Sequence, residues 1–340
     1  MNNNYLILIL IPSFYILNFF LIKNKILLDL STSSNHKKFT NKSLVPLSGG
    51  ILILISLIFF IKEISYFDKI LISFMFFLGL SSDLQKLKSP IVRLLLQFLI
   101  ISIILINNKL YVAQTRLMYV DYFIENYFLF KFFFTVFCLL ILINGTNFMD
   151  GVNGLSIGYF LIIVVNIFLN SINNIIPVDH FNLNILIQFM SVFLLFNFFS
   201  KSFLGDSGSY LISTYMGIYL ISYFNHYQEL ISPFYICLLL WYPAFENFFS
   251  IIRRKLVSKG FSTYADNQHL HHYLFKFLNK KIKKNYISNS FSGIIINTIN
   301  FLFIFLGSYF INKTKPLVVI IIVLILLYLF SYFFLKKNNN

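Results

Sequence analysis

Four polar clusters interrupt an otherwise very apolar sequence, and two of them carry residue types used in phosphate chemistry. Asn147 and Asp150 are three residues apart, so one helical turn would place both side chains on the same face. Asp206 stands among glycines and serines at the start of an apolar run. Backbone N–H groups at such a helix start can hold phosphate oxygens, and a carboxylate there can hold a hard cation.

The other two clusters add a carboxylate and a group of histidines. Asp83 ends the segment 79–83, which closes another apolar run. His269, His271 and His272 fall within four residues, inside a segment 251–290 that carries nine cationic residues and therefore suits a polyanion. Carboxylates, backbone donors and cations are together the parts of a phosphoryl-transfer site.

Each cluster also has an ordinary explanation when it is taken alone. Asp206 could cap a helix, Asp83 could end one, and the segment 144–154, which is rich in glycine and asparagine, could be a turn. The histidines could form a solvated interfacial patch or a zinc site, although no cysteine accompanies them. A shared use is favoured because all four clusters fall on one side of the membrane in the topology derived below.

The composition determines the class of protein. Of 340 residues, 58% are hydrophobic and only 11% are charged, whereas soluble domains carry about 25% charged residues. This excludes a soluble enzyme, a disordered chain and a disulfide scaffold, and it predicts an all-α polytopic membrane protein. The net charge of +15 does not indicate nucleic-acid binding, because the cations lie between apolar runs and no binding module is visible.

Eleven apolar runs are long enough to predict about eleven transmembrane helices in a single integral domain over residues 1–340. The runs lie near 5–22, 50–66, 67–81, 91–106, 127–144, 155–171, 185–200, 208–224, 230–250, 291–311 and 316–335. The Lys and Arg residues set the orientation, since 20 of the 27 lie in or just beside the segments that alternate to one side. These segments are 23–49, 82–90, 145–154, 201–207, the large basic loop 251–290 and the C-terminal tail. All four polar clusters are therefore predicted at the cytoplasmic face.

Four segments carry a family resemblance: 45–50, 144–155, 205–209 and the histidine cluster. They resemble the motifs of the polyprenyl-phosphate N-acetylhexosamine-1-phosphate transferases, and the histidines resemble those of the branch that transfers N-acetylglucosamine 1-phosphate to undecaprenyl phosphate. The resemblance implies that a polyprenyl phosphate attacks the β-phosphorus of a UDP-N-acetylhexosamine and that UMP leaves. It also implies a multi-pass protein of the bacterial inner membrane that initiates a cell-surface polysaccharide, such as the O-antigen of lipopolysaccharide.

The resemblance also assigns residues to roles. It implies catalytic roles for Asp83, Asp150 and Asp206, and a site for Mg²⁺, or alternatively Mn²⁺, formed by Asp206, Asp150 and Asn147. The expected substrate-binding residues are Lys37, Lys38, Asn147, Asn153, His269, His271 and His272. The expected partners are the UDP-N-acetylhexosamine, the polyprenyl phosphate and membrane lipid, with no nucleic acid; a homodimer is left open.

One departure from the family pattern leaves the chemistry open at one point. Ser82 stands where the family usually has the first of two aspartates, the residue often proposed as base or binding partner for the lipid phosphate. Three alternatives therefore remain: the related phospho-N-acetylmuramoyl-pentapeptide transferase, a transporter of the same lipids, and an inactive membrane scaffold. A transporter would favour carboxylates and broken helices near the middle of the bilayer.

Overall fold

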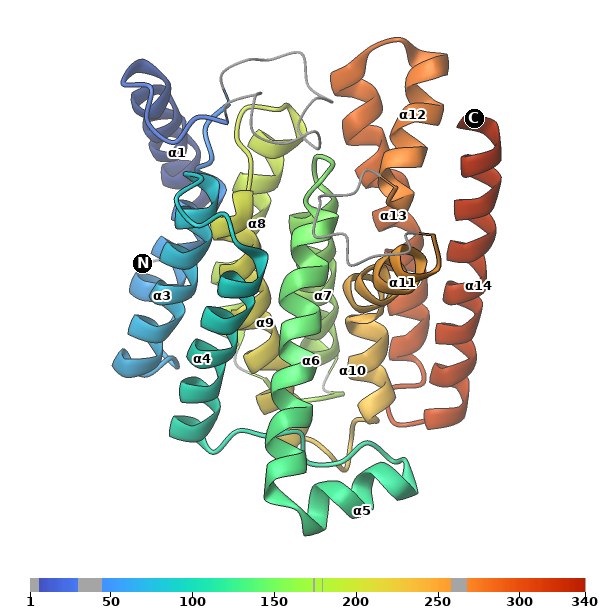
Figure 1. Ribbon diagram of the computed structural model, residues 1–340. Helices are drawn as coiled ribbons and strands as arrows, with labels where there is room; N and C mark the ends of the chain where they lie inside the picture. The colour runs from blue at the N-terminus through green and yellow to red at the C-terminus, as the bar shows by residue number, and fades with distance from the viewer. Residues whose placement is uncertain (1–5, 30–44, 174, 179, 258–267, 340) are drawn as a thin grey trace.

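A computed structural model describes residues 6–29, 45–173, 175–178, 180–257 and 268–339, and this part of the chain is a bundle of helices with no strand (Figure 1). The first half contains α1 (Leu6–Lys23), α2 (Gly49–Ile55), the π-helical turn η3 (Ser56–Phe60), α3 (Tyr66–Asp83), α4 (Pro90–Asn108), α5 (Met118–Asn126), α6 (Phe128–Met149) and α7 (Leu155–Ile172). The second half contains α8 (His180–Phe198), α9 (Gly205–His226), α10 (Pro233–Leu239), α11 (Trp241–Val257), α12 (Leu270–Ile282), α13 (Asn285–Ser308) and α14 (Thr314–Asn339).

The predicted all-α membrane class is confirmed, and each of the eleven predicted runs contains a helix. Within the described residues, seven helices are long and apolar enough to cross a membrane, or eight if α10 and α11 count as one span. The α2–η3 segment is only 12 residues long, and α3 carries Asp68, Lys69 and Asp83. Eleven spans therefore remain a prediction, as does the side of the membrane that each end faces.

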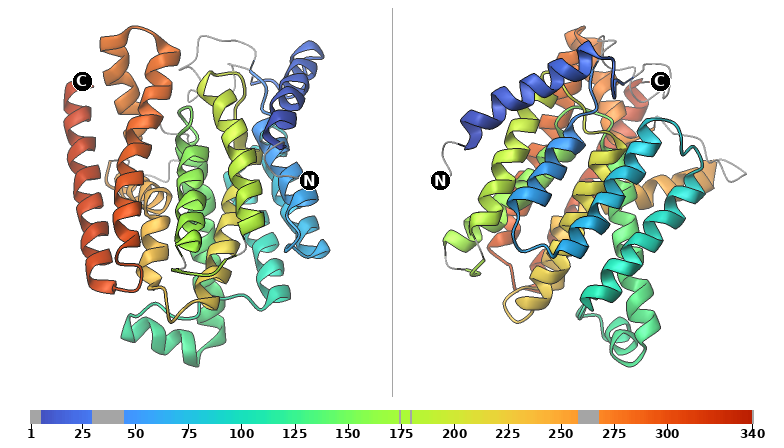
Figure 2. Two further views of the ribbon diagram at one scale, coloured as in Figure 1. Left: turned by 180° about the vertical axis from the view of Figure 1, so that it is seen from behind. Right: turned by 90° about the vertical axis from the view of Figure 1, so that its left-hand side faces the viewer.

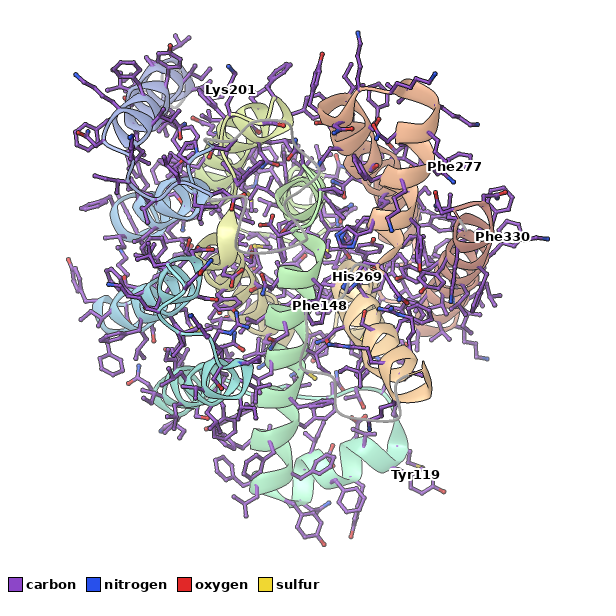
Figure 3. The ribbon with its side chains drawn as sticks, turned by 45° about the horizontal axis from the view of Figure 1, so that its top comes forward. Tyr119, Phe148, Lys201, His269, Phe277 and Phe330 are labelled. Atoms are coloured by element: carbon purple, nitrogen blue, oxygen red, sulfur yellow. The ribbon has the colours of Figure 1, made fainter. Side chains whose placement is uncertain are left out.

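The outer surface of the bundle is apolar, as a lipid-facing surface must be. Large hydrophobic side chains on the peripheral helices are exposed, among them Leu8 in α1, Leu95 in α4 and Phe330 in α14. Figure 3 shows Phe330 at the rim, directed away from the bundle. In water such a surface would be an aggregation hazard, whereas in a bilayer it is the solvated face.

The centre of the bundle is formed by α7, α8 and α9, and glycines on the neighbouring helices α2 and α3 let these helices approach α9 closely. A side chain at Gly79 in α3 would place its Cβ 2.5 Å from the carbonyl oxygen of Asp206. A side chain at Gly50 in α2 would reach within 2.8 Å of the backbone nitrogen of Gly208. Backbone contact of this kind needs glycine. The two glycines therefore bring α2 and α3 against the first turn of α9, where Asp206 lies.

The predicted run 230–250 is broken, because α10 and α11 meet at an angle of 72°. Pro243 has no N–H to donate to the carbonyl of Leu239 four residues earlier, which breaks the hydrogen-bond ladder. The hydroxyl of Tyr159 in α7 donates to that carbonyl at 2.8 Å and accepts from the backbone N–H of Tyr242 at 3.4 Å. In Figure 2, right, α11 consequently projects sideways from the bundle.

The polar clusters come together at one end of the bundle. The C-terminal ends of α3, α6 and α8 and the N-terminal ends of α7, α9 and α12 lie toward the upper side of Figure 1, while α5 lies across the opposite end. Most of the described residues of the predicted basic loop 251–290 are helical, and they form the end of α11, all of α12 and the start of α13. The predicted alternation of chain direction is thus consistent with the arrangement of the helices.

Candidate active site

Asp206 lies in the first turn of α9 and is bound by two side chains from other helices. The hydroxyl of Ser82 donates to Asp206 Oδ2 at 2.5 Å, and Arg93 Nη1 donates to the same oxygen at 3.2 Å. Arg93 Nη1 also donates to the Ser82 hydroxyl at 2.6 Å. The side chains of Arg93 and Asp206 are 24% and 26% exposed. The carboxylate is therefore accessible to a ligand and lies beside a fixed positive charge.

Asp83 holds the N-terminus of α9 from a neighbouring helix. Its Oδ1 accepts from the backbone N–H of Asp206 at 2.9 Å, and its Oδ2 accepts from that of Ser207 at 3.0 Å. These are the donors that a helix leaves without internal partners, and a negative charge there is favoured by the helix dipole. Gly205 has a φ of +72°, and a Cβ there would lie 2.7 Å from the carboxylate. Asp83 therefore caps α9, while its predicted catalytic role remains a prediction.

Asn147 lies in the last turn of α6 and Asp150 directly follows the helix, so α6 extends beyond the predicted run, which ended near 144. The residue after Asp150 contacts the histidines. The backbone N–H of Asp150 donates to the carbonyl of Asn147 at 3.3 Å. At Gly151 a Cβ would lie 2.5 Å from His271 Nε2 and 2.8 Å from His272 Nε2. Only glycine fits this approach without displacing an imidazole. We call residues 150–154, between α6 and α7, the central loop. The central loop and the histidine cluster, more than 100 residues apart in the sequence, thus form one site.

Asn153 is buried and joins the central loop to two other segments. Its backbone N–H donates to Asn289 Oδ1 at 2.6 Å, and its side-chain amide donates to the hydroxyls of Ser200 at 2.7 Å and Ser290 at 3.4 Å. The neighbouring Gly154 N–H donates to Asn197 Oδ1 at 2.6 Å. Because residues 197–204 lead directly into α9, these bonds connect the central loop to the turn that carries Asp206. The structure gives Asn153 a supporting position in the loop, and its predicted contact with substrate remains untested.

The three histidines are buried at the start of α12. His269 Nδ1 lies 2.7 Å from Glu246 Oε1 and 3.3 Å from the hydroxyl of Ser250. The ring of His269 stacks on that of His271 with centroids 5.4 Å apart, and His271 and His272 are 4.2 Å apart. Phe148, in the last turn of α6, packs against His269 with ring centroids 5.4 Å apart, and Figure 3 shows these two side chains together near the centre.

Three residues of this arrangement were not singled out as site residues by the sequence analysis: Glu246, Arg93 and, as a ligand of Asp206, Ser82. Glu246 lies inside the predicted run 230–250, and an isolated carboxylate within an apolar run is a signal of function that could have identified it. Arg93 was counted only as a marker of topology. Its proximity to Asp206 has no counterpart in the sequence, because 113 residues separate them.

Several predictions about this site are not tested by the structure. Lys37 and Lys38 lie outside the described residues. Among the described residues no group of three or more His, Cys, Asp or Glu side chains is arranged to hold a metal. Mg²⁺ is commonly held by only one or two carboxylates together with substrate phosphates, so the carboxylate and amide oxygens of Asp206, Asp150 and Asn147 are of the type that it binds. A single ion shared by the three residues stays a prediction.

Comparison with known families agrees with this geometry. Residues 69–224 match glycosyl transferase family 4. The matched region begins in α3 and ends in α9, so it includes Asp83, the central loop and Asp206 but not the histidines. No curated protein matches the sequence. The family match supports a polyprenyl-phosphate hexose-1-phosphate transferase, and it indicates a membrane enzyme that transfers a sugar phosphate to a lipid carrier.

Proposed function

We propose that the protein transfers N-acetylhexosamine 1-phosphate from a UDP-N-acetylhexosamine to a polyprenyl phosphate. An oxygen of the lipid phosphate forms a bond to the β-phosphorus, the bond from that phosphorus to the bridging oxygen breaks, and UMP leaves with the electron pair. The product is a lipid-linked sugar pyrophosphate. The observation that carries the proposal is the convergence of the α3 end, the α9 start and the central loop, all within the matched region.

The lipid phosphate needs little help to become a nucleophile. The second pKa of a phosphate monoester is about 6, so at neutral pH the group is mostly dianionic. Ser82 in place of an aspartate is therefore compatible with turnover. The larger obstacle is repulsion between the two anionic substrates, about 4 kcal/mol for each pair of unit charges 4 Å apart in a partly solvated site. Arg93 supplies a positive charge beside Asp206, the carboxylate that we place next to the reacting phosphates, and this charge would reduce the repulsion between them.

The remaining residues have roles that follow from their positions. Asp206, with Asp150 and Asn147, would hold Mg²⁺ together with the diphosphate, and the ion would neutralise charge on the leaving group. His269, His271 and His272 would donate hydrogen bonds to the diphosphate or the uridine. Because the imidazoles contact Gly151, they would meet the substrate beside the central loop. We place this site at the cytoplasmic face of the bacterial inner membrane, where nucleotide sugars are available.

A lipid transporter is the second candidate, and one observation favours it. The α10–α11 break and the buried Glu246 in α11 are features of transporter binding sites. However, the Glu246 carboxylate is bound to His269, which belongs to the cluster beside the central loop, so both features can serve the transferase site. The remaining enzyme alternative, a phospho-N-acetylmuramoyl-pentapeptide transferase, would use a different donor nucleotide. Supplying both kinds of donor in the transfer assay distinguishes the two enzymes.

The test is a transfer assay on the full-length protein in membranes. Radiolabelled UDP-N-acetylglucosamine, UDP-N-acetylgalactosamine or UDP-N-acetylmuramoyl-pentapeptide is supplied with undecaprenyl phosphate and Mg²⁺, and UMP and the labelled lipid are measured. We expect turnover with a UDP-N-acetylhexosamine and its loss in Asp206→Asn. Asp121→Asn is the matched control, because Asp121 is in α5 at the opposite end and accepts hydrogen bonds from Thr115. Turnover in Asp206→Asn equal to that of the wild type, or none with any donor, would refute the proposal.

A further inference from the structure

Glu246 is a carboxylate buried in the bundle and held by groups from two other segments. Its side chain lies in α11 and is fully buried. One oxygen, Oε1, lies 2.7 Å from His269 Nδ1, just before α12. The other, Oε2, accepts a hydrogen bond from the hydroxyl of Tyr328 in α14 at 2.8 Å. The residue lies outside the region that matches glycosyl transferase family 4.

A carboxylate in this position is expensive, and the surrounding structure is arranged to keep it there. Moving a charge from water into a protein interior costs several kcal/mol unless hydrogen bonds compensate. An apolar residue would fill the same volume at lower cost. The neighbours of Glu246 also include the rings of Phe245 and Phe249, which pack on Tyr328 with centroids 5.0 Å and 5.5 Å away. These contacts fix the hydroxyl that binds Oε2.

The bond to Nδ1 determines how His269 can act. A carboxylate accepts a hydrogen bond, so it selects the state of His269 in which Nδ1 carries a proton and points at Glu246. Nε2 is then the ring nitrogen that can meet a ligand, and the plane of the ring is fixed. His269 stacks on His271 with an angle of 11° between the rings, and His271 contacts Gly151. Because the three rings pack against one another, the orientation of His269 also restricts the orientations of His271 and His272.

We propose that Glu246 is a positioning residue: with Tyr328 it orients the histidine cluster toward the diphosphate of the nucleotide sugar. This inference rests on the proposed function, since it assigns the nucleotide half of the substrate to the histidines. Glu246 does not touch the substrate and acts through His269. Outer partners of this kind typically change affinity or activity by roughly 10- to 100-fold when they are replaced.

The test compares Glu246→Gln and Tyr328→Phe with Tyr332→Phe. Glutamine keeps the shape and removes the charge, and Tyr328→Phe removes only the hydroxyl on the far side of the carboxylate. Tyr332 is one turn further along α14 and is equally buried, so Tyr332→Phe is the matched control. We expect the KM for UDP-N-acetylglucosamine to rise about tenfold in Glu246→Gln and less in Tyr328→Phe, while the KM for undecaprenyl phosphate stays constant. A structural defect would change both constants or the yield of folded protein.

A second comparison shows whether Glu246 acts through His269. In a His269→Gln background, adding Glu246→Gln should change the KM for the nucleotide sugar by less than twofold, because the imidazole to be oriented is absent. Equal effects in both backgrounds, or an unchanged KM in Glu246→Gln, would overturn the inference. Equilibrium binding of UDP-N-acetylglucosamine is measured on the same proteins. If the wild type binds the nucleotide but transfers nothing, the proposed function fails while the binding data still decide the role of Glu246. If Glu246→Gln does not fold, Tyr328→Phe takes its place: a raised KM for the nucleotide sugar supports the inference, and an unchanged KM overturns it.

Discussion

Ser82→Asp would place a second carboxylate beside Asp206, where the wild type has a hydroxyl that donates to Asp206 at 2.5 Å and accepts from Arg93 at 2.6 Å. In the wild type the charges of Arg93 and Asp206 cancel. The variant keeps Arg93 as a partner for both carboxylates and leaves one net negative charge on these three side chains, in addition to the charge of Asp83 at the start of α9. If this site holds a divalent cation together with the diphosphate, the extra charge should strengthen the binding of that cation.

The size of the effect follows from the separation and the exposure of the groups. For a divalent cation about 5 Å from the added charge, Coulomb's law gives about 7 kcal/mol at an effective dielectric constant of about 20 and about 1.7 kcal/mol at about 80. The two charged side chains are about one-quarter exposed, and salt and the neighbouring Arg93 charge screen the interaction further, so we take the lower figure as the minimum effect. We therefore expect the Mg²⁺ concentration for half-maximal transfer to fall at least about tenfold.

The assay is a titration of transfer activity with Mg²⁺ at fixed substrate concentrations, repeated at two salt concentrations. Ser81→Asp is the matched control, since it adds the same charge one position before Ser82, where the hydroxyl bonds to the carbonyl of Phe77 in its own helix instead of to Asp206. The effect in Ser82→Asp should shrink at higher salt. An unchanged or increased Mg²⁺ requirement in Ser82→Asp, or an equal fall in Ser81→Asp, would refute the assignment of the cation to Asp206.

Three further predictions address the supports of the site. Asp83→Asn should lower the free energy of unfolding by about 1 kcal/mol, because an amide caps α9 without the charge that the helix dipole favours; thermal unfolding measures this, and Asp68→Asn at the other end of α3 shows how much any carboxylate loss costs. Gly151→Ala should reduce transfer by at least tenfold with little change in melting temperature, since a Cβ there displaces an imidazole by about 1 Å and misplacement of that size can cost 10²-fold; full activity would contradict the contact. Tyr159→Phe should lower stability by about 1–3 kcal/mol, because the carbonyl at the end of α10 loses its donor inside the membrane; a melting temperature equal to that of the wild type would contradict the account of the bend.

Much of the fold could be predicted because it depends on composition and on local pattern. Long apolar runs in a chain with 11% charged residues can only be satisfied as helices in a bilayer, since each helix bonds its own backbone groups. The breaks between runs, and the distribution of Lys and Arg, then place the polar clusters at one end. The start of α9 at Asp206 was found in this way, whereas α6 continues to Met149, beyond its predicted end near 144.

The features that the sequence did not predict are contacts between distant segments. The structural positions of Asp83 and Asn153 are examples, because Asp83 caps another helix and Asn153 joins the central loop to two other segments; their predicted roles with substrate stay predictions. The break before α11 has a local signal in Pro243, but the angle depends on a hydroxyl supplied by α7. Glu246 had a local signal as well, although nothing in its neighbourhood identifies His269 and Tyr328 as its partners.

The sequence by itself determined the membrane class and the apolar segments that form most of the helices, because transfer of apolar side chains into lipid and the satisfaction of each helix backbone are local properties. It did not predict α5 or α12, which lie outside the apolar runs. Only the tertiary structure decided which charges face each other. Arg93 with Asp206, and Glu246 with His269, are brought together by close packing at glycines and by one bent helix. Pairs of this kind depend on the three-dimensional arrangement of several helices, and no spacing along the chain encodes it.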